Sequence, residues 1–127
     1  MRVLIIGAGA SGLPAIKCCL EEGLTPICLE RSGDVGGLWN FANSLVTKDD
    51  IACVTRSTVI NTSKEMMCYS DCPIPADYPN FMPNSHTLQY LRMYADAFNL
   101  KQYIKLNTMV CSIHLFILSF IHLFTLQ

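Results

Sequence analysis

Three glycines near the N-terminus have the spacing of a loop that holds the phosphates of a dinucleotide. Gly7, Gly9 and Gly12 form the pattern G-x-G-x-x-G directly after the apolar run Val-Leu-Ile-Ile. The first glycine permits a tight turn, the second lets the backbone approach a pyrophosphate, and the third lets a helix pack closely on a strand. The other candidate cofactor-binding residues of this loop are Ala8, Ala10 and Ser11.

An acidic residue stands where a dinucleotide-binding fold needs one. Glu30 ends the next apolar run, eighteen positions after Gly12. A carboxylate there accepts hydrogen bonds from ribose hydroxyls and repels a 2′-phosphate, which favours FAD or NAD over NADP. The neighbouring Arg31 leaves the opposite interpretation open, because an arginine can pair with a 2′-phosphate. A tight turn that binds nothing is the other alternative.

These residues can act together only if a strand, a helix and a second strand surround them. The continuous apolar run predicts a strand over residues 2–6, covered on both faces. A helix is expected from the glycine loop to about Glu22, with Gly23 as its C-cap. A second buried strand is expected over residues 25–29. This order is the one that supports a phosphate-binding turn.

The rest of the chain alternates loops with regular elements. Residues 31–41 form a glycine-rich loop that contains the only tryptophan, Trp39. Residues 51–60 favour a strand, residues 61–70 are expected to be irregular, and four prolines make the following stretch extended. Apolar residues at helical spacing predict a helix over 85–98 with Ser85 as N-cap, and alternation predicts a strand over 104–110. The order of the elements therefore indicates the α/β fold class, with a Rossmann-like, doubly wound, parallel sheet.

The composition of the chain argues against two classes of protein. The chain has 127 residues, 51% of them hydrophobic and 15% charged, with a net charge of −1. A chain this apolar is not intrinsically disordered as a whole. No cluster of lysine or arginine could hold a nucleic acid backbone, so we expect no nucleic acid partner.

Seven cysteines occur without a C-x-x-C pair. Cys68, Cys72 and His86 miss the usual spacing of zinc ligands, so no metal site is predicted. We interpret the cysteines as reduced thiols in a reducing compartment. A secreted, disulfide-stapled domain is the alternative, since Arg2 and the following apolar stretch loosely match a signal peptide.

The C-terminal segment is set apart by its composition. Residues 109–127 contain no Lys, Arg, Asp or Glu and just reach the length of a membrane span. We expect residues 114–127 to be a divergent apolar tail that does not belong to the dinucleotide-binding domain. The tail is interpreted either as a product of alternative splicing or as a membrane anchor.

Four stretches together resemble the flavin-containing monooxygenases. They are residues 7–13 (GAGASGL), 30–39 (ERSGDVGGLW), 61–66 (NTSKEM) and 77–81 (DYPNF). The resemblance covers residues 2 to about 113. It implies that the α/β unit is an incomplete, Rossmann-like, doubly wound FAD-binding half-domain with a parallel sheet, and that residues 1–113 are the N-terminal part of an FAD-binding domain. It implies a flavin-dependent monooxygenase that uses FAD, NADPH and O2 to oxygenate the nitrogen or sulfur of soft nucleophiles such as amines and sulfides. It also implies the cytosolic face of the endoplasmic reticulum membrane, or the cytoplasm if the tail is not an anchor.

The resemblance assigns roles to individual residues. The Gly7 to Gly12 loop would hold the FAD pyrophosphate, and Glu30 the adenosine ribose. Asn61 would be the catalytic residue, placed with Thr62 beside the isoalloxazine, where the amide helps hold the nicotinamide and the oxygenated flavin. A loop-capping asparagine is the alternative at that position. Further residues expected to line the FAD site are Gly37, Leu38 and Trp39.

The sequence also departs from the family pattern. No glycine follows Gly37, so the 127 residues contain no second glycine-rich loop for NADPH, and the family's F-x-G-x-x-x-H pattern is absent. We therefore expect the chain to be inactive by itself. The alternative function is that of a non-catalytic truncated isoform that binds FAD weakly or acts on partners of the full-length enzyme.

Overall fold

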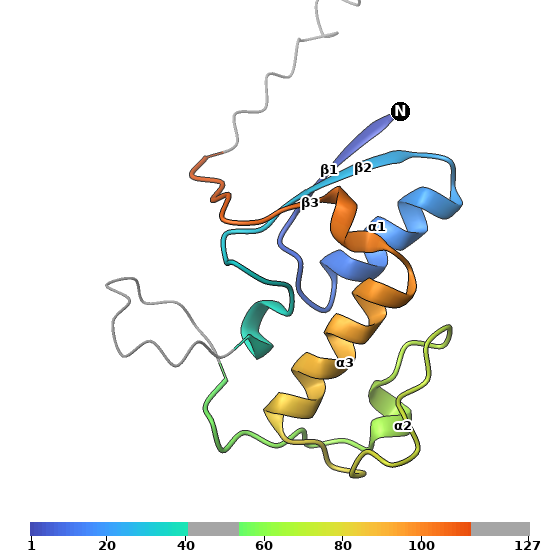
Figure 1. The fold of residues 1–127 in the computed structure, drawn as a ribbon, viewed down its shortest axis with the longest axis vertical. Coiled ribbons are helices and arrows are strands. Elements are labelled where there is room, and N and C mark those ends of the chain that lie inside the picture. Colours follow the sequence, from blue (N-terminus) through green and yellow to red (C-terminus); the bar gives the residue numbers. More distant parts are fainter. Residues whose placement is uncertain (41–53, 113–127) are drawn as a thin grey trace, which may run out of the picture.

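Strands and helices follow one another in the order of a parallel sheet with crossover helices. The computed structural model describes residues 1–40 and 54–112. Figure 1 shows the course of the chain through its elements. These are β1 (Arg2–Ile6), α1 (Gly12–Glu21), β2 (Thr25–Leu29), the 3₁₀ helix η1 (Gly37–Trp39), α2 (Lys64–Met67), α3 (Asn84–Ala97), the 3₁₀ helix η2 (Leu100–Tyr103) and β3 (Ile104–Lys105).

The sheet has the strand order β1-β2-β3, and both pairs are parallel. Leu4 of β1 lies opposite Ile27 of β2, and Cys28 lies opposite Ile104 of β3. The helix α1 makes the crossover between β1 and β2 and ends at Glu21. Gly23, which follows the C-cap Glu22, has the left-handed φ of 68° that is typical of a glycine after a helix. The predicted fold class, an incomplete Rossmann-like half-domain with a parallel sheet, is confirmed.

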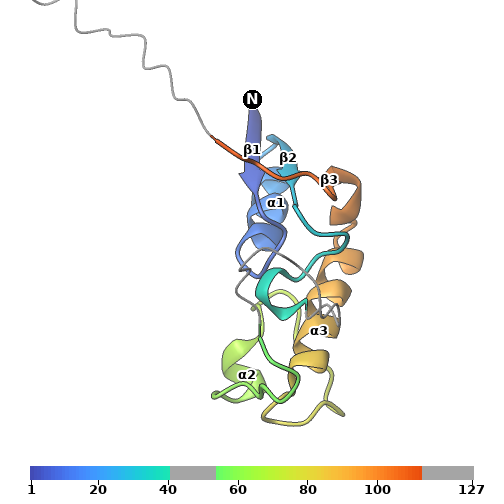
Figure 2. The same cartoon turned by 90° about the vertical axis from the view of Figure 1, so that its left-hand side faces the viewer.

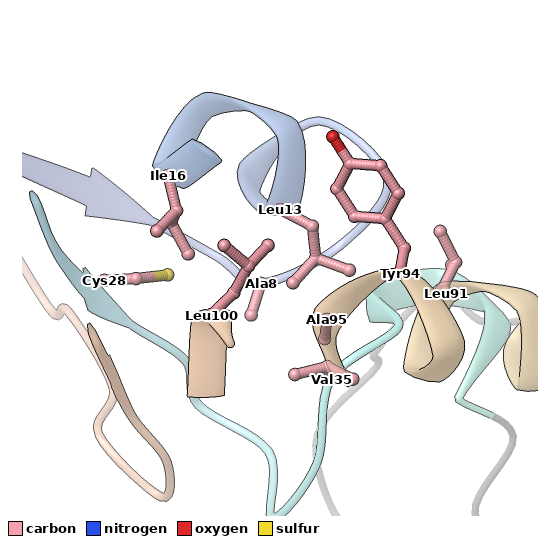
Figure 3. Packing of buried hydrophobic residues seen from close by; sticks show 9 residues of the cluster. All are labelled: Ala8, Leu13, Ile16, Cys28, Val35, Leu91, Tyr94, Ala95 and Leu100. Atoms are coloured by element: carbon pink, nitrogen blue, oxygen red, sulfur yellow. The ribbon is translucent and has the colours of Figure 1, made fainter. Parts of the chain in front are cut away.

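One apolar core joins the N-terminal unit to the C-terminal helices. Figure 3 shows side chains from α1, from the loop after β1 and from α3 directed toward one another. The core is formed by Ala8, Leu13, Ile16, Cys28, Val35, Leu91, Tyr94, Ala95 and Leu100. Residues far apart in sequence therefore hold the glycine loop in place.

The first strand is covered on one face only, contrary to the expectation from its apolar sequence. Leu4 is 59% exposed and Ile6 is 50% exposed. Figure 2 shows α1 on one side of β1 and β2, and the described residues place no helix on the other side. The alternate residues Val3 and Ile5 are half-buried. The expected burial on both faces is therefore wrong for β1, because no second layer is present among the described elements.

Three other features of the fold differ from the sequence predictions: two element boundaries and one additional helix. The third strand ends at Lys105 rather than near residue 110, because Asn107 has a left-handed φ of 52°. The helix α3 begins at Asn84, directly after Pro83, so Ser85 is not its N-cap. Part of the segment expected to be irregular forms the short helix α2.

The predicted strand over residues 51–60 lies partly outside the described residues. From residue 54 onward it contributes only an isolated antiparallel bridge between Val59 and Pro83. That bridge joins the segment to the start of α3. The segment therefore runs beside α3 instead of joining the parallel sheet.

Candidate functional site

The turn between β1 and α1 closes so tightly that only glycine fits at two positions. Gly7 has a φ of 91°, a conformation that side chains disfavour. A Cβ added to Gly12 would lie 1.9 Å from the carbonyl oxygen of Gly7. The first and third glycines of the motif are therefore required by the backbone itself.

A second glycine turn packs against the first. The N–H of Gly36 donates a hydrogen bond of 2.9 Å to the carbonyl oxygen of Ala8. A Cβ on Gly9 would lie 3.4 Å from the Cα of Gly37, so the two backbones are in van der Waals contact. The glycine loop 7–12 and the turn that begins η1 thus form one continuous backbone surface.

The helix α1 begins at this surface without a side-chain cap. Its N-cap, Ser11, makes no capping hydrogen bond through its side chain, and no acidic residue lies in the first turn. The N–H groups of a helix's first turn have no partner within the helix, and the helix dipole favours negative charge there. The geometry suits a phosphate or pyrophosphate.

The side chain of Glu30 connects the glycine loop to the segment after β2 by hydrogen bonds. One carboxylate oxygen accepts a 2.7 Å hydrogen bond from the N–H of Ala8, and the other accepts 2.8 Å bonds from the N–H and hydroxyl of Ser32. The side chain is only 4% exposed. Burial raises the pKa of Glu30, but these hydrogen bonds outweigh it and hold the pKa below its ordinary value. The carboxylate is therefore an ionised, fixed acceptor beside the loop.

A cavity of about 530 Å³ borders the glycine loop at Ala10. It has the size of a typical small-molecule site and is mostly apolar. Four predicted site residues line it: Ala10, Trp39, Asn61 and Thr62. The structure thus brings together residues from three separate loops that the sequence had assigned to one cofactor.

Two predicted site residues of η1 lie elsewhere. Leu38 is 55% exposed and is not among the residues that line the cavity. Gly37 contacts Gly9 instead and belongs to the glycine surface. The prediction that Leu38 lines an FAD site stays a prediction.

The cavity wall also includes residues that the sequence analysis did not select. Tyr69 donates a hydrogen bond of 2.5 Å from its hydroxyl to the carbonyl oxygen of Ala10. Its ring lies against Tyr90 and Tyr94 of α3, with centroids 5.8 and 4.5 Å away. No sequence motif marks Tyr69, and only the approach of α3 to the glycine loop reveals it. The remaining lining residues are Thr58, Val59, Ile60, Met67 and Leu91.

The described residues show no other chemical centre. Within residues 1–40 and 54–112 there is no group of three or more His, Cys, Asp or Glu side chains suited to a metal ion. The cysteines of this part of the chain are all free thiols. No helix in the same ranges is both long enough and apolar enough to cross a membrane.

Comparison with known proteins now decides the family. The sequence model of the family described as "FMO-like: Flavin-binding monooxygenase-like" matches residues 1–116. The chain belongs to this family. The predicted resemblance to the flavin-containing monooxygenases is therefore confirmed, and it rests on nearly the whole described chain.

Curated members of the flavin-binding monooxygenase-like family are close in sequence. Flavin-containing monooxygenase 5 of Mus musculus is 60% identical over 112 residues, which is 88% of this chain. Flavin-containing monooxygenase 1 of Sus scrofa is 57% identical over the same length. This chain spans only 21% of the length of each relative.

Solved structures of flavin monooxygenases share the fold. The S-allyl-L-cysteine S-oxygenase of Allium sativum superposes with a TM-score of 0.73 at 25% identity, over 84% of this chain and 27% of the other. A steroid monooxygenase bound to NADP gives a TM-score of 0.68 at 24% identity, over 84% and 19% of the two chains. The fold described above is therefore shared with parts of these two larger oxygenases.

Proposed function

We propose that this chain supplies the FAD-binding surface of a flavin-dependent monooxygenase. The reaction class follows from the family: FAD, NADPH and O2 oxygenate the nitrogen or sulfur of soft nucleophiles such as amines and sulfides. The observation that carries the proposal is the contact of two glycine turns at Gly9 and Gly37 in front of the uncapped start of α1. Such a surface accepts a pyrophosphate closely, because no side chain stands in the way.

Different residues of the chain would bind different parts of the cofactor. The backbone of residues 7–12 would hold the pyrophosphate, with the positive end of α1 directed at it. Glu30 would accept hydrogen bonds from the adenosine ribose with its remaining lone pairs, since a carboxylate has more acceptor sites than the three bonds observed. The flavin, when bound, supplies the electron and oxygen transfer.

The cavity fits the ring end of the same cofactor. Its lining includes Ala10 of the glycine loop as well as Asn61 and Thr62. A ligand whose pyrophosphate is held by the glycine loop would therefore have the cavity beside it at Ala10. The amide of Asn61 has donors and an acceptor to orient a flavin or a nicotinamide, and Trp39 and Tyr69 provide aromatic walls. The apolar lining would restrict water near the reacting atoms.

We also propose that the chain alone does not oxidise NADPH. All seven glycines lie at or before Gly37, so a second phosphate-binding glycine turn is not present in these 127 residues. The match to about a fifth of each relative supports the same expectation. Location at the endoplasmic reticulum, and the choice of amine or sulfide substrate, remain predictions from the family.

The test compares two glycine substitutions that crowd the protein equally. A Cβ at Gly9 would lie 3.4 Å from the Cα of Gly37, and a Cβ at Gly33 would lie 3.4 Å from Oδ1 of Asn107. We expect Gly9→Ala to weaken FAD binding at least about tenfold, equivalent to about 1.4 kcal/mol, because the methyl group stands where the pyrophosphate approaches. Gly33→Ala should bind FAD as the wild type does.

Isothermal or fluorescence titration with FAD measures both variants, and thermal unfolding verifies that they fold. Equal FAD affinity in Gly9→Ala and Gly33→Ala would refute the proposed binding surface. NADPH oxidation by the wild-type chain with FAD, at a rate above that of free FAD, would refute the proposed inactivity. The two outcomes are independent, so each part of the proposal is tested separately.

A further inference from the structure

The backbone hydrogen bonds at the start of α1 are interrupted at the carbonyl of Ala10. The N–H groups of Leu13 and Ala15 donate to the carbonyl oxygens four residues before them, over 3.1 and 3.3 Å. The carbonyl of Ala10 lies between those two acceptors, and its donor in the same pattern would be the N–H of residue 14. That residue is Pro14, whose nitrogen carries no hydrogen. The helix itself therefore offers Ala10 no donor.

The hydroxyl of Tyr69 supplies a donor from a distant part of the chain. It donates a hydrogen bond of 2.5 Å to the carbonyl oxygen of Ala10. Burial raises the pKa of Tyr69, and the nearby carboxylate of Asp71 raises it further. The phenol therefore keeps its proton near neutral pH and remains a donor.

Contacts with both α1 and α3 hold Tyr69 in place. Its N–H donates a 2.8 Å hydrogen bond to the hydroxyl of Tyr90, and its ring lies against the ring of Tyr94, with centroids 4.5 Å apart. Two residues further on, Asp71 forms an ion pair of 2.6 Å with Lys17 of α1. The position of the hydroxyl is therefore set by two helices as well as by its own loop.

The hydrogen bond from Tyr69 also fixes the direction of a neighbouring N–H group. The peptide bond between Ala10 and Ser11 is trans, so its C=O and N–H groups point in opposite directions. With the carbonyl held toward Tyr69, the N–H of Ser11 is directed away from it. Ser11 is the N-cap of α1 and part of the loop 7–12. An N–H already fixed in direction binds an anion with a smaller loss of conformational freedom.

We infer that Tyr69 is a positioning residue for the cofactor: its hydroxyl replaces the donor that Pro14 lacks and orients the N–H of Ser11 for the pyrophosphate. The inference rests on the proposed function, because it assigns Tyr69 to the loop that would hold the pyrophosphate. The hydroxyl acts on the loop, whereas the rest of the side chain lines the cavity. The two roles can therefore be tested separately.

Titrations with FAD and with ADP separate these roles, because both ligands contain the adenosine pyrophosphate and ADP has no flavin. Tyr69→Phe removes the hydroxyl and keeps the ring. Tyr78→Phe is the matched control, because it removes a hydroxyl that contacts the sulfur of Met93 at 3.7 Å. We expect Tyr69→Phe to weaken the binding of both ligands at least about fivefold, and Tyr78→Phe to change neither. A loss for FAD alone would overturn the inference, since it would assign Tyr69 to the flavin.

A double substitution tests the part played by Pro14. Pro14→Ala restores an N–H that can donate to the carbonyl of Ala10 in the regular helical pattern. In the Pro14→Ala background we expect Tyr69→Phe to change the affinity for ADP less than about twofold, because the carbonyl then has another donor. An equal loss of affinity with and without Pro14→Ala would overturn the inference.

The outcomes distinguish this inference from the proposed function. If the wild-type chain binds neither FAD nor ADP, the proposed function fails and the inference fails with it. If the wild type binds both and Tyr69→Phe binds them equally well, the inference alone fails. Thermal unfolding verifies that each variant folds. If Tyr69→Phe does not fold by itself, restored folding in the double variant would support the inference, and unfolding of both variants would overturn it.

Discussion

Gly12 and Gly9 belong to one motif, but an added Cβ would meet different surroundings at the two positions. The backbone carbonyl of Gly7 leaves no room for a Cβ at Gly12, whereas a Cβ at Gly9 meets only ordinary contact. The fold itself therefore requires Gly12, whereas we propose that Gly9 is required by the ligand. The structure shows the first requirement, and the FAD titration of Gly9→Ala tests the second.

Gly12→Ala should consequently lower the free energy of unfolding, with or without FAD. The clash involves backbone on both sides, so relief requires the turn to move, at a cost of about 3 kcal/mol. Chemical denaturation measures the change, and Gly33→Ala is the control, because its Cβ would lie 3.4 Å from the nearest atom, Oδ1 of Asn107. A loss of less than about 0.5 kcal/mol in Gly12→Ala would show that the turn is looser than described.

Glu30 makes the stability of the loop depend on pH. Its folded-state pKa lies below the ordinary value, so its contribution is present above the unfolded-state pKa and is lost as pH falls through the folded-state pKa. We expect the wild type to exceed Glu30→Gln in stability near neutral pH and to lose that advantage below about pH 4.5. Urea denaturation of both proteins at several pH values measures this difference. A difference that stays constant down to about pH 3 would contradict the argument.

At the scale of elements, α3 connects the cavity wall to the core. The hydroxyl of Tyr90 accepts a 2.8 Å hydrogen bond from the N–H of Tyr69 and donates a 2.7 Å bond to the carbonyl oxygen of Cys72. The side chain is fully buried. One phenol therefore satisfies two backbone groups of the segment that presents Tyr69 to the glycine loop.

Tyr90→Phe should destabilise the chain by about 1–3 kcal/mol, because it leaves both backbone groups without their partner. Tyr78→Phe is the matched control, since the hydroxyl of Tyr78 contacts only the sulfur of Met93, at 3.7 Å. Thermal and chemical unfolding measure both. Equal stability losses in the two variants would show that the Tyr90 hydroxyl does not hold this segment.

The sequence predicted some elements better than others for physical reasons. The first strand, crossover helix and second strand were located to within one residue, because a continuous apolar run, a glycine loop and a C-cap glycine are local signals. The third strand was predicted too long. Alternation continues past Lys105, but the left-handed Asn107 ends the pairing, and an asparagine adopts that conformation only where its surroundings favour it.

The residues of the candidate site also differ in how well the sequence predicted them. The positions of Gly7 to Gly12 and Glu30 follow from spacing alone, since these residues are close in sequence to the strands that carry them. Tyr69 could not be found in this way, because its role depends on α3 packing beside the glycine loop. Tertiary contacts between distant segments give no pattern in a single sequence.

At the scale of the whole molecule, the chain combines a complete glycine turn, which we propose binds the pyrophosphate, with an incomplete sheet. It spans about a fifth of the length of its curated relatives. The three strands leave β1 at an edge and expose Leu4 and Ile6. Binding of FAD would therefore add stability to a small core, by an amount that grows with the ratio of ligand concentration to Kd.

The most direct test of the proposed function is a titration of the 127-residue chain with FAD, followed by absorbance and melting temperature. We predict saturable binding of one FAD per chain, a flavin spectrum changed from that of free FAD, and a melting temperature that rises with FAD concentration. An unchanged spectrum and a melting temperature that does not respond to FAD would contradict the account, because the two glycine turns would then form a fold without forming a site.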